Sequence, residues 1–111
     1  MKKMIVVMMS LMISSMAFAA KPAVRCQKAV EKQEEGLASE SSANPEDKAV
    51  LLEQLRNGDF EVTEEEYTLI ESLLERKDTL AFSFGNDAGA WLTIANAKTC
   101  KVLDTTQVVA H

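Results

Sequence analysis

The sequence predicts an α+β domain in which about three N-terminal helices precede a small three-stranded antiparallel meander. Up to Asp78, apolar residues recur at the helical spacing of three and four positions, and after it they alternate at the strand spacing of two. Turn-forming residues at 85–89 and 96–99 divide the second half into three short apolar segments. The two cysteines, Cys26 and Cys100, lie near opposite ends of the chain, and we expect one disulfide to join the first helix to the last strand.

The first 19 residues have the layout of a secretory signal peptide. Two lysines at positions 2 and 3 precede an uncharged apolar run at 4–18, and alanines at 17 and 19 fit a cleavage site after Ala19. The run is shorter than the roughly 20 residues that a membrane anchor requires. All six methionines lie in this segment. We therefore expect a signal peptide at 1–19, one small domain at 20–111, and a bacterial protein that is periplasmic or secreted, without stable membrane insertion after cleavage.

The first helix of the domain is expected at 23–39, with Pro22 at its start. Proline is favoured at the first helical position because its missing N–H would have no partner there. Cys26, Val30 and Leu37 recur at helical spacing on one narrow face. The polar segment at 39–44 then predicts a linker to the second helix.

The second helix is expected to begin with Asn44 as its N-cap and Pro45 at its first position, because both residue types are favoured there. Leucines at positions 51, 52 and 55 form its apolar face, and Asn57-Gly58 is typical of a helix end.

The third helix has the clearest local pattern. Thr63 and Glu66 have the spacing of a capping box, in which each side chain accepts a hydrogen bond from the other residue's backbone N–H. Val62 and Tyr67 stand at the positions of a hydrophobic staple. The acidic run at 64–66 is therefore explained by the helix start, and as a metal site it would fail because consecutive helical residues diverge by about 100° each.

Three strands are expected after Asp78. Leu80, Phe82 and Phe84 alternate with small residues, and 90–95 and 100–109 read as the second and third strands. The segment 90–98 also fits the helical period, so strand and helix both remain open there.

The charge of the chain restricts its partners. The full chain has a formal net charge of −5, and loss of residues 1–19 with their two lysines makes it −7. Residues 31–75 carry 14 acidic residues against three basic ones, a net charge of −11. Nucleic acids and anionic membranes need lysine and arginine clusters, so we do not expect them as partners. A basic protein would be favoured electrostatically, although the acidic residues could also serve only to keep helix surfaces soluble.

The sequence offers few residues for catalysis, and we expect no enzyme activity, no cofactor and no metal site. Cys26 and Cys100 are 74 positions apart and form no C-x-x-C motif, which indicates a structural disulfide. The one histidine is the last residue, His111. No G-x-S-x-G motif occurs, and 86–89 is too short for a calcium loop.

Phe60 and Trp91 are the candidate interface residues. Phe60 lies between two expected helices with an acidic residue on each side, and Trp91 follows the turn at 85–89. Large aromatic side chains often anchor interfaces. In a small domain they also complete the core, and the sequence leaves both roles open.

Export, a disulfide, an acidic surface and the lack of a catalytic set together suggest a non-enzymatic binding protein. The first hypothesis is an inhibitor or immunity-type protein that binds another envelope or secreted protein. The second is a periplasmic acid-stress chaperone, because protonation of the carboxylates would make the net charge positive at low pH. The third is a structural role in the envelope.

Overall fold

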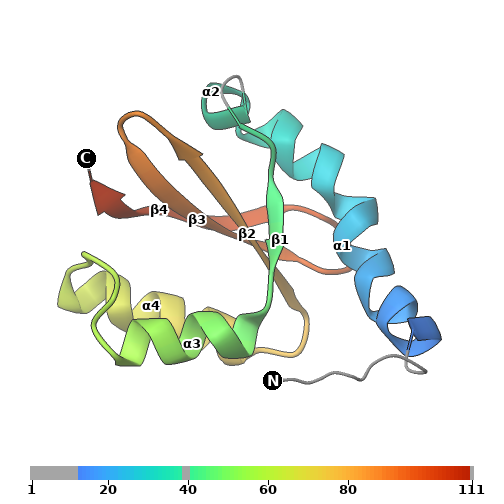
Figure 1. The fold of residues 1–111 in the computed structure, drawn as a ribbon, viewed down its shortest axis with the longest axis horizontal. Coiled ribbons are helices and arrows are strands. Elements are labelled where there is room, and N and C mark those ends of the chain that lie inside the picture. The colour runs from blue at the N-terminus through green and yellow to red at the C-terminus, as the bar shows by residue number, and fades with distance from the viewer. Residues whose placement is uncertain (1–12, 39–40, 111) are drawn as a thin grey trace.

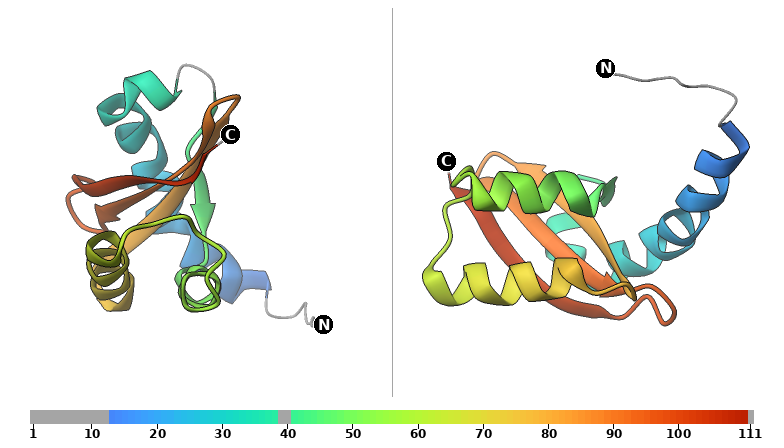
Figure 2. Two further views of the ribbon diagram at one scale, coloured as in Figure 1. Left: turned by 90° about the vertical axis from the view of Figure 1, so that its left-hand side faces the viewer. Right: turned by 90° about the horizontal axis from the view of Figure 1, so that it is seen from below.

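The computed structural model describes residues 13–38 and 41–110, and residues 1–12 of the expected signal peptide lie outside this part. A four-stranded antiparallel sheet in the order β1-β2-β3-β4 separates two groups of helices (Figures 1 and 2). The elements are α1 (Ile13–Gln33), α2 (Glu35–Ala38), β1 (Asn44–Glu46), α3 (Lys48–Arg56), α4 (Glu64–Glu75), β2 (Thr79–Asn86), β3 (Gly89–Asn96) and β4 (Val102–Ala110). The α+β class and the Cys26–Cys100 disulfide are confirmed, whereas the sheet has four strands instead of three.

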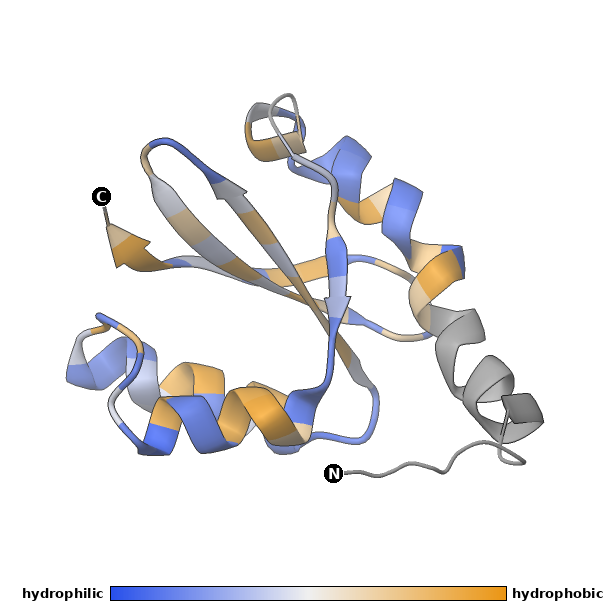
Figure 3. Ribbon diagram, viewed as in Figure 1, coloured by the Kyte–Doolittle hydropathy of each residue, from blue (hydrophilic) through white to orange (hydrophobic). Residues whose placement is uncertain are grey.

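The two faces of the sheet carry two separate apolar cores. On one face, α3 and α4 pack against the sheet in what we call the hairpin cluster, which includes Leu55, Ile70, Leu92 and Ile94. On the other face, α1 and α2 cover the disulfide cluster: Cys26, Val30, Ala43, Phe82, Phe84, Ala95 and Cys100. Both cores are possible because successive residues of a strand point to opposite faces. Figure 3 shows polar and apolar residues mixed along α3 and α4.

The fourth strand arises from a segment that was expected to begin a helix. Asn44–Glu46 pairs with Ser83–Ala81 as β1, and the N-cap of α3 is Asp47, whose side chain accepts hydrogen bonds from Ala49 N and Val50 N. Aspartate caps a helix as well as asparagine does. Proline is tolerated on an edge strand, so Pro45 does not prevent the pairing. The expected N-cap at Asn44 is therefore wrong.

The first helix also differs from its expected bounds. α1 (Ile13–Gln33) already includes residues upstream of Pro22 and ends at Gln33, and α2 follows after one turn residue. The Gln33 side chain leaves the helix end for β4: its amide donates to Cys100 O at 2.6 Å, and its oxygen accepts from Val102 N at 2.8 Å. Within the described residues, no helix combines the length and the hydropathy needed to cross a membrane.

The helix hairpin α3–α4 follows its local sequence signals. Asn57 caps the end of α3, and Gly58 takes a φ of 81°, a left-handed conformation that glycine adopts without strain. The capping box is confirmed, with Thr63 N to Glu66 Oε1 at 2.8 Å and Glu66 N to Thr63 Oγ1 at 3.1 Å. Val62 and Tyr67 both pack against the hairpin cluster.

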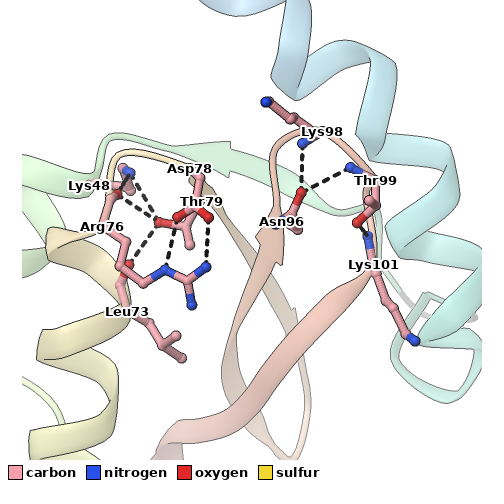
Figure 4. A network of polar contacts seen from close by, with 9 residues as sticks. All are labelled: Lys48, Leu73, Arg76, Asp78, Thr79, Asn96, Lys98, Thr99 and Lys101. Carbon is pink, nitrogen blue, oxygen red and sulfur yellow. Dashed lines mark hydrogen bonds and ion pairs between the residues drawn. The ribbon is translucent and has the colours of Figure 1, made fainter.

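A polar network connects α3, α4 and the start of β2 (Figure 4). The Lys48 ammonium donates to Arg76 O at 2.6 Å and to Thr79 Oγ1 at 3.1 Å, and the buried Thr79 hydroxyl donates to Leu73 O at 2.7 Å. Partial burial lowers the pKa of Lys48, and the nearby charge of Asp78 opposes this effect. These side chains donate to carbonyl groups at the end of α4, where Leu73 O also accepts from the backbone N–H of the C-cap residue Arg76.

Residues 90–98 form the strand β3 and a following turn, so the helical alternative is wrong. β3 pairs along its length with β2 and β4, which gives its backbone groups partners on both sides. In the next turn, Asn96 Oδ1 accepts from Lys98 N at 2.8 Å and Thr99 N at 3.0 Å (Figure 4). Cys100 then takes a φ of 62°, which is unusual for a residue other than glycine.

Candidate functional site

A groove crosses the α3–α4 face of the sheet and has a volume of about 240 Å³. Small-molecule pockets usually measure roughly 300–1,000 Å³, so this space suits one large side chain of a partner better than a whole ligand. All four strands, α3 and the loop between α3 and α4 contribute to it. We call it the sheet groove, and its lining residues are Glu46, Leu51, Gln54, Phe60, Ser83, Ala90, Trp91, Leu92, Val108 and Val109.

The floor of the sheet groove is rigid because it is made of strand residues. Leu92 and Val108 are buried members of the hairpin cluster, and Ala90 and Val109 pack against the same cluster. Backbone pairing on both sides of β3 fixes Ala90 and Leu92. Val108 lies at a register shift of the β3–β4 pair, and its carbonyl accepts a hydrogen bond from Glu61 N. A binding surface on such a floor needs little reordering when a partner arrives, which lowers the entropic cost of association.

Phe60 is held in the groove wall by its two neighbours. Asp59 N donates to Gln54 O at 3.0 Å, which closes the end of α3, and Glu61 N donates to Val108 O at 2.7 Å, which ties the loop to β4. Glu61 Oε1 also accepts from Ala110 N at 3.2 Å. The ring of Phe60 is half-buried against the hairpin cluster, so it forms part of the core and part of the groove surface.

Trp91 has a different position from the one that an interface role would favour. It lines the groove between Ala90 and Leu92, yet it stands opposite Phe84 in the β2–β3 pair and packs against the disulfide cluster. Residues opposite one another in an antiparallel pair share a face of the sheet. The structure therefore brings Phe60 and Trp91 to the same groove, but it packs the Trp91 side chain on the α1 face.

The polar end of the groove lies at β1. Ser83 Oγ donates to Glu46 Oε2 at 2.6 Å, and Glu46 is exposed. The position of β1 depends on α1, because Gln27 donates to Ala43 O at 2.7 Å and Glu31 accepts from Ala43 N at 2.9 Å. Two side chains of α1 thus hold both backbone groups of the residue that precedes β1.

The carboxylates around the groove have no cationic partner in the described part of the chain. Ion pairs there join Arg56 to Glu71 and Glu75, and Arg76 to Asp78. Glu46, which lines the groove, and Asp59 and Glu61, which flank Phe60, take part in none of them. The groove therefore has a mostly apolar lining, with negative charge at Glu46 and at the two residues that flank Phe60 in the chain.

The disulfide does not line the sheet groove and lies in the disulfide cluster on the opposite face of the sheet. Cys26 and Cys100 have a Cα–Cα distance of 5.0 Å, and both are buried, at 0% and 7% exposure. Beside the bond, Arg25 donates to Ala97 O at 2.8 Å. These contacts attach α1 to the β3–β4 turn. The predicted pairing of the cysteines is confirmed, but Cys100 lies in this turn, two residues before β4 begins, and not in the last strand as expected.

The expected explanation of the acidic run also fits the structure. Glu64, Glu65 and Glu66 occupy the first turn of α4, where negative charge interacts favourably with the helix dipole. Residues 13–38 and 41–110 contain no group of three or more histidine, cysteine, aspartate or glutamate side chains arranged to hold a metal ion.

Three polar residues of the groove were not singled out from the sequence: Glu46, Gln54 and Ser83. Glu46 follows Pro45 in the segment that the sequence predicts to begin the second helix, so the sequence does not indicate its place on a strand. For Ser83 a signal existed, because it alternates with Phe82 and Phe84 and therefore points to the other face of the sheet. The chain matches no family of known proteins, no curated protein and no solved structure.

Proposed function

We propose that the protein is a small exported binding protein without enzymatic activity that holds another envelope or secreted protein at the sheet groove. The observation that supports this proposal is the groove itself, where an apolar floor on a paired sheet meets the half-buried ring of Phe60. Aromatic residues at the edge of such a depression are frequent anchors of interfaces.

The charge around the groove suggests the chemistry of the partner. Glu46, Asp59 and Glu61 are exposed and make no ion pair among the described residues. Like charges across an interface are unfavourable, and opposite charges accelerate association. A partner surface with an apolar residue next to lysine or arginine therefore fits this site best.

Export is part of the same proposal. A buried disulfide is compatible with an oxidising compartment. The expected cut after Ala19 falls inside α1, and Pro22 lies three residues beyond it. Pro22 has no backbone N–H to donate to the carbonyl of a preceding residue. Cleavage after Ala19 would therefore break no hydrogen bond at Pro22, and a helix can begin there. We therefore propose cleavage of a signal peptide at 1–19 and a periplasmic or secreted location.

The experiment compares capture of an envelope protein by three immobilised baits: the oxidised protein, Phe60→Ala and Leu69→Ala. Leu69 is a matched control because it is 45% exposed on α4 and does not line the sheet groove. We expect the parent and Leu69→Ala to capture the same stoichiometric partner, and Phe60→Ala to lose it. The melting temperature of each bait is measured in parallel, so that loss of binding is separated from loss of folding.

The captured partner also allows a test of whether the protein is an inhibitor or immunity-type protein. An inhibitor or immunity-type protein would abolish the activity of its captured partner at a one-to-one ratio. Equal capture by Phe60→Ala and the parent, with both folded, would show that the sheet groove is not the binding site.

A further inference from the structure

We propose that the sheet groove takes a lysine or arginine side chain of the partner, with the aliphatic stem on the groove floor and the cation at Glu46. This inference rests on the proposed binding function and adds the identity of the anchoring residue. It follows from the position of one carboxylate, that of Glu46, at the end of a groove whose lining is mostly apolar and also includes the polar side chains Gln54 and Ser83.

The floor of the groove fits the stem of a long basic side chain. The strand residues Leu92 and Val108 are buried in the floor. Leu51 of α3 and Phe60 line the groove beside them. Lysine and arginine side chains commonly lay their methylene groups along apolar surface while the charged end reaches a polar environment. A volume of about 240 Å³ is sufficient for such a side chain and too small for a usual drug-sized ligand.

The carboxylate of Glu46 provides the acceptor for the cation. Its Oε2 atom is held at 2.6 Å by the Ser83 hydroxyl, which fixes the orientation of the group and leaves Oε1 as a further acceptor. No cation of the described chain pairs with Glu46. A charge-assisted bond to a fixed carboxylate is stronger than a bond between neutral groups.

Other side chains fit this arrangement less well. A glutamate of the partner would meet Glu46 and the acidic residues beside Phe60, which is unfavourable for like charges. An apolar side chain such as leucine would fill the floor but would make no use of the carboxylate. The groove therefore favours a residue that is apolar along its length and positively charged at its end.

The test uses three blocked tripeptides, with lysine, norleucine or glutamate between two alanines, titrated into the full oxidised protein. Binding is followed by NMR through the backbone amides of the residues that line the sheet groove. Norleucine is the matched probe for lysine because it has the same stem without the ammonium group. We expect the lysine peptide to bind roughly fivefold more tightly than the norleucine peptide, which is the scale of one partly exposed ion pair.

Two variants identify the acceptor. In Glu46→Gln, the Ser83 hydroxyl can still donate to the side-chain oxygen, but the charge is gone, so the preference for lysine over norleucine should disappear. Glu53→Gln is the control, because Glu53 is exposed on α3 and does not line the groove. It should keep the preference.

Equal binding of lysine and norleucine to the parent protein would overturn the inference while leaving the groove as an apolar binding site. A lysine preference that survives in Glu46→Gln, or no shift of the groove amides with any peptide, would also overturn it. The capture experiment with Phe60→Ala is independent of these results, so the failure of the inference and the failure of the proposed function can be told apart.

Discussion

Loss of the Cys26–Cys100 disulfide should have the largest effect on stability. The bond closes a loop with a sequence separation of 74 residues. In the chain-entropy treatment, the loop-closure entropy removed from the unfolded chain corresponds to about 4.5 kcal/mol at 25 °C. The free energy of unfolding of a domain is typically about 5–15 kcal/mol, so this bond could supply a third of it or more.

The assay compares urea unfolding of the oxidised protein, the reduced protein and the double variant Cys26→Ala/Cys100→Ala. We expect both altered forms to lose about 4 kcal/mol of unfolding free energy and roughly 20–30 °C in melting temperature. The double variant should lose somewhat more than the reduced protein, because both cysteines are buried and alanine leaves unfilled space in the disulfide cluster.

Amide hydrogen exchange shows which part of the domain is destabilised when the disulfide is lost. α1 is attached to the sheet by the disulfide, by burial of Val30 and by hydrogen bonds from Arg25 and Gln33. Reduction should therefore increase amide hydrogen exchange in α1 more than in α3 or α4. A loss of less than about 1 kcal/mol on reduction would refute the reasoning, because the predicted entropy of closing so long a loop is several times larger.

Three further predictions concern local features. Thr63→Ala removes an acceptor at the start of α4 and should lower the free energy of unfolding by about 1 kcal/mol in urea titration; no change would mean that water replaces the cap at no cost. At Gly89, φ is 145° and an added Cβ would lie 2.1 Å from Val109 O. Gly89→Ala should therefore melt at a lower temperature than Thr63→Ala. Melting at the temperature of the parent protein would contradict the close approach of β3 and β4 at this residue. The hydrogen bond from Arg76 lowers the pKa of Asp78 below its usual value of 3.8. The ion pair therefore stabilises the protein above that pH, and this stabilisation is lost as the pH falls further. In Asp78→Asn the free energy of unfolding should fall less steeply with pH in this acidic range, and an unchanged dependence on pH would contradict the contribution of the pair.

The sequence predicts those parts of the fold that depend on local interactions. The capping box of Thr63 and Glu66, the helix end at Gly58 and the β-strand period after Asp78 are each determined within a few residues. The disulfide was also predictable, because a chain that is expected to be exported and has two cysteines has one possible intramolecular pairing. The local features agree with the structure because no distant contact opposes them.

The element that could not be predicted depends on a distant partner. Asn44, Pro45 and Glu46 have the residue types of a helix start, and only the free edge of β2 turns them into a strand. The groove could not be predicted for the same reason, because the position of Glu46 follows from the pairing of β1 with β2. For Trp91, the strand assignment left open which face its side chain would occupy, and the cross-strand partner Phe84 decides it.

The order of the strands in the sheet has a consequence for the path of folding. β2, β3 and β4 are neighbours both in the chain and in the sheet, so their pairing requires only short turns to close. Contacts between segments close in sequence form quickly, whereas α1 must meet the β3–β4 turn across most of the chain. The meander and the α3–α4 hairpin should therefore assemble first, and docking of α1 should be the slow final step, which oxidation of the two thiols makes permanent.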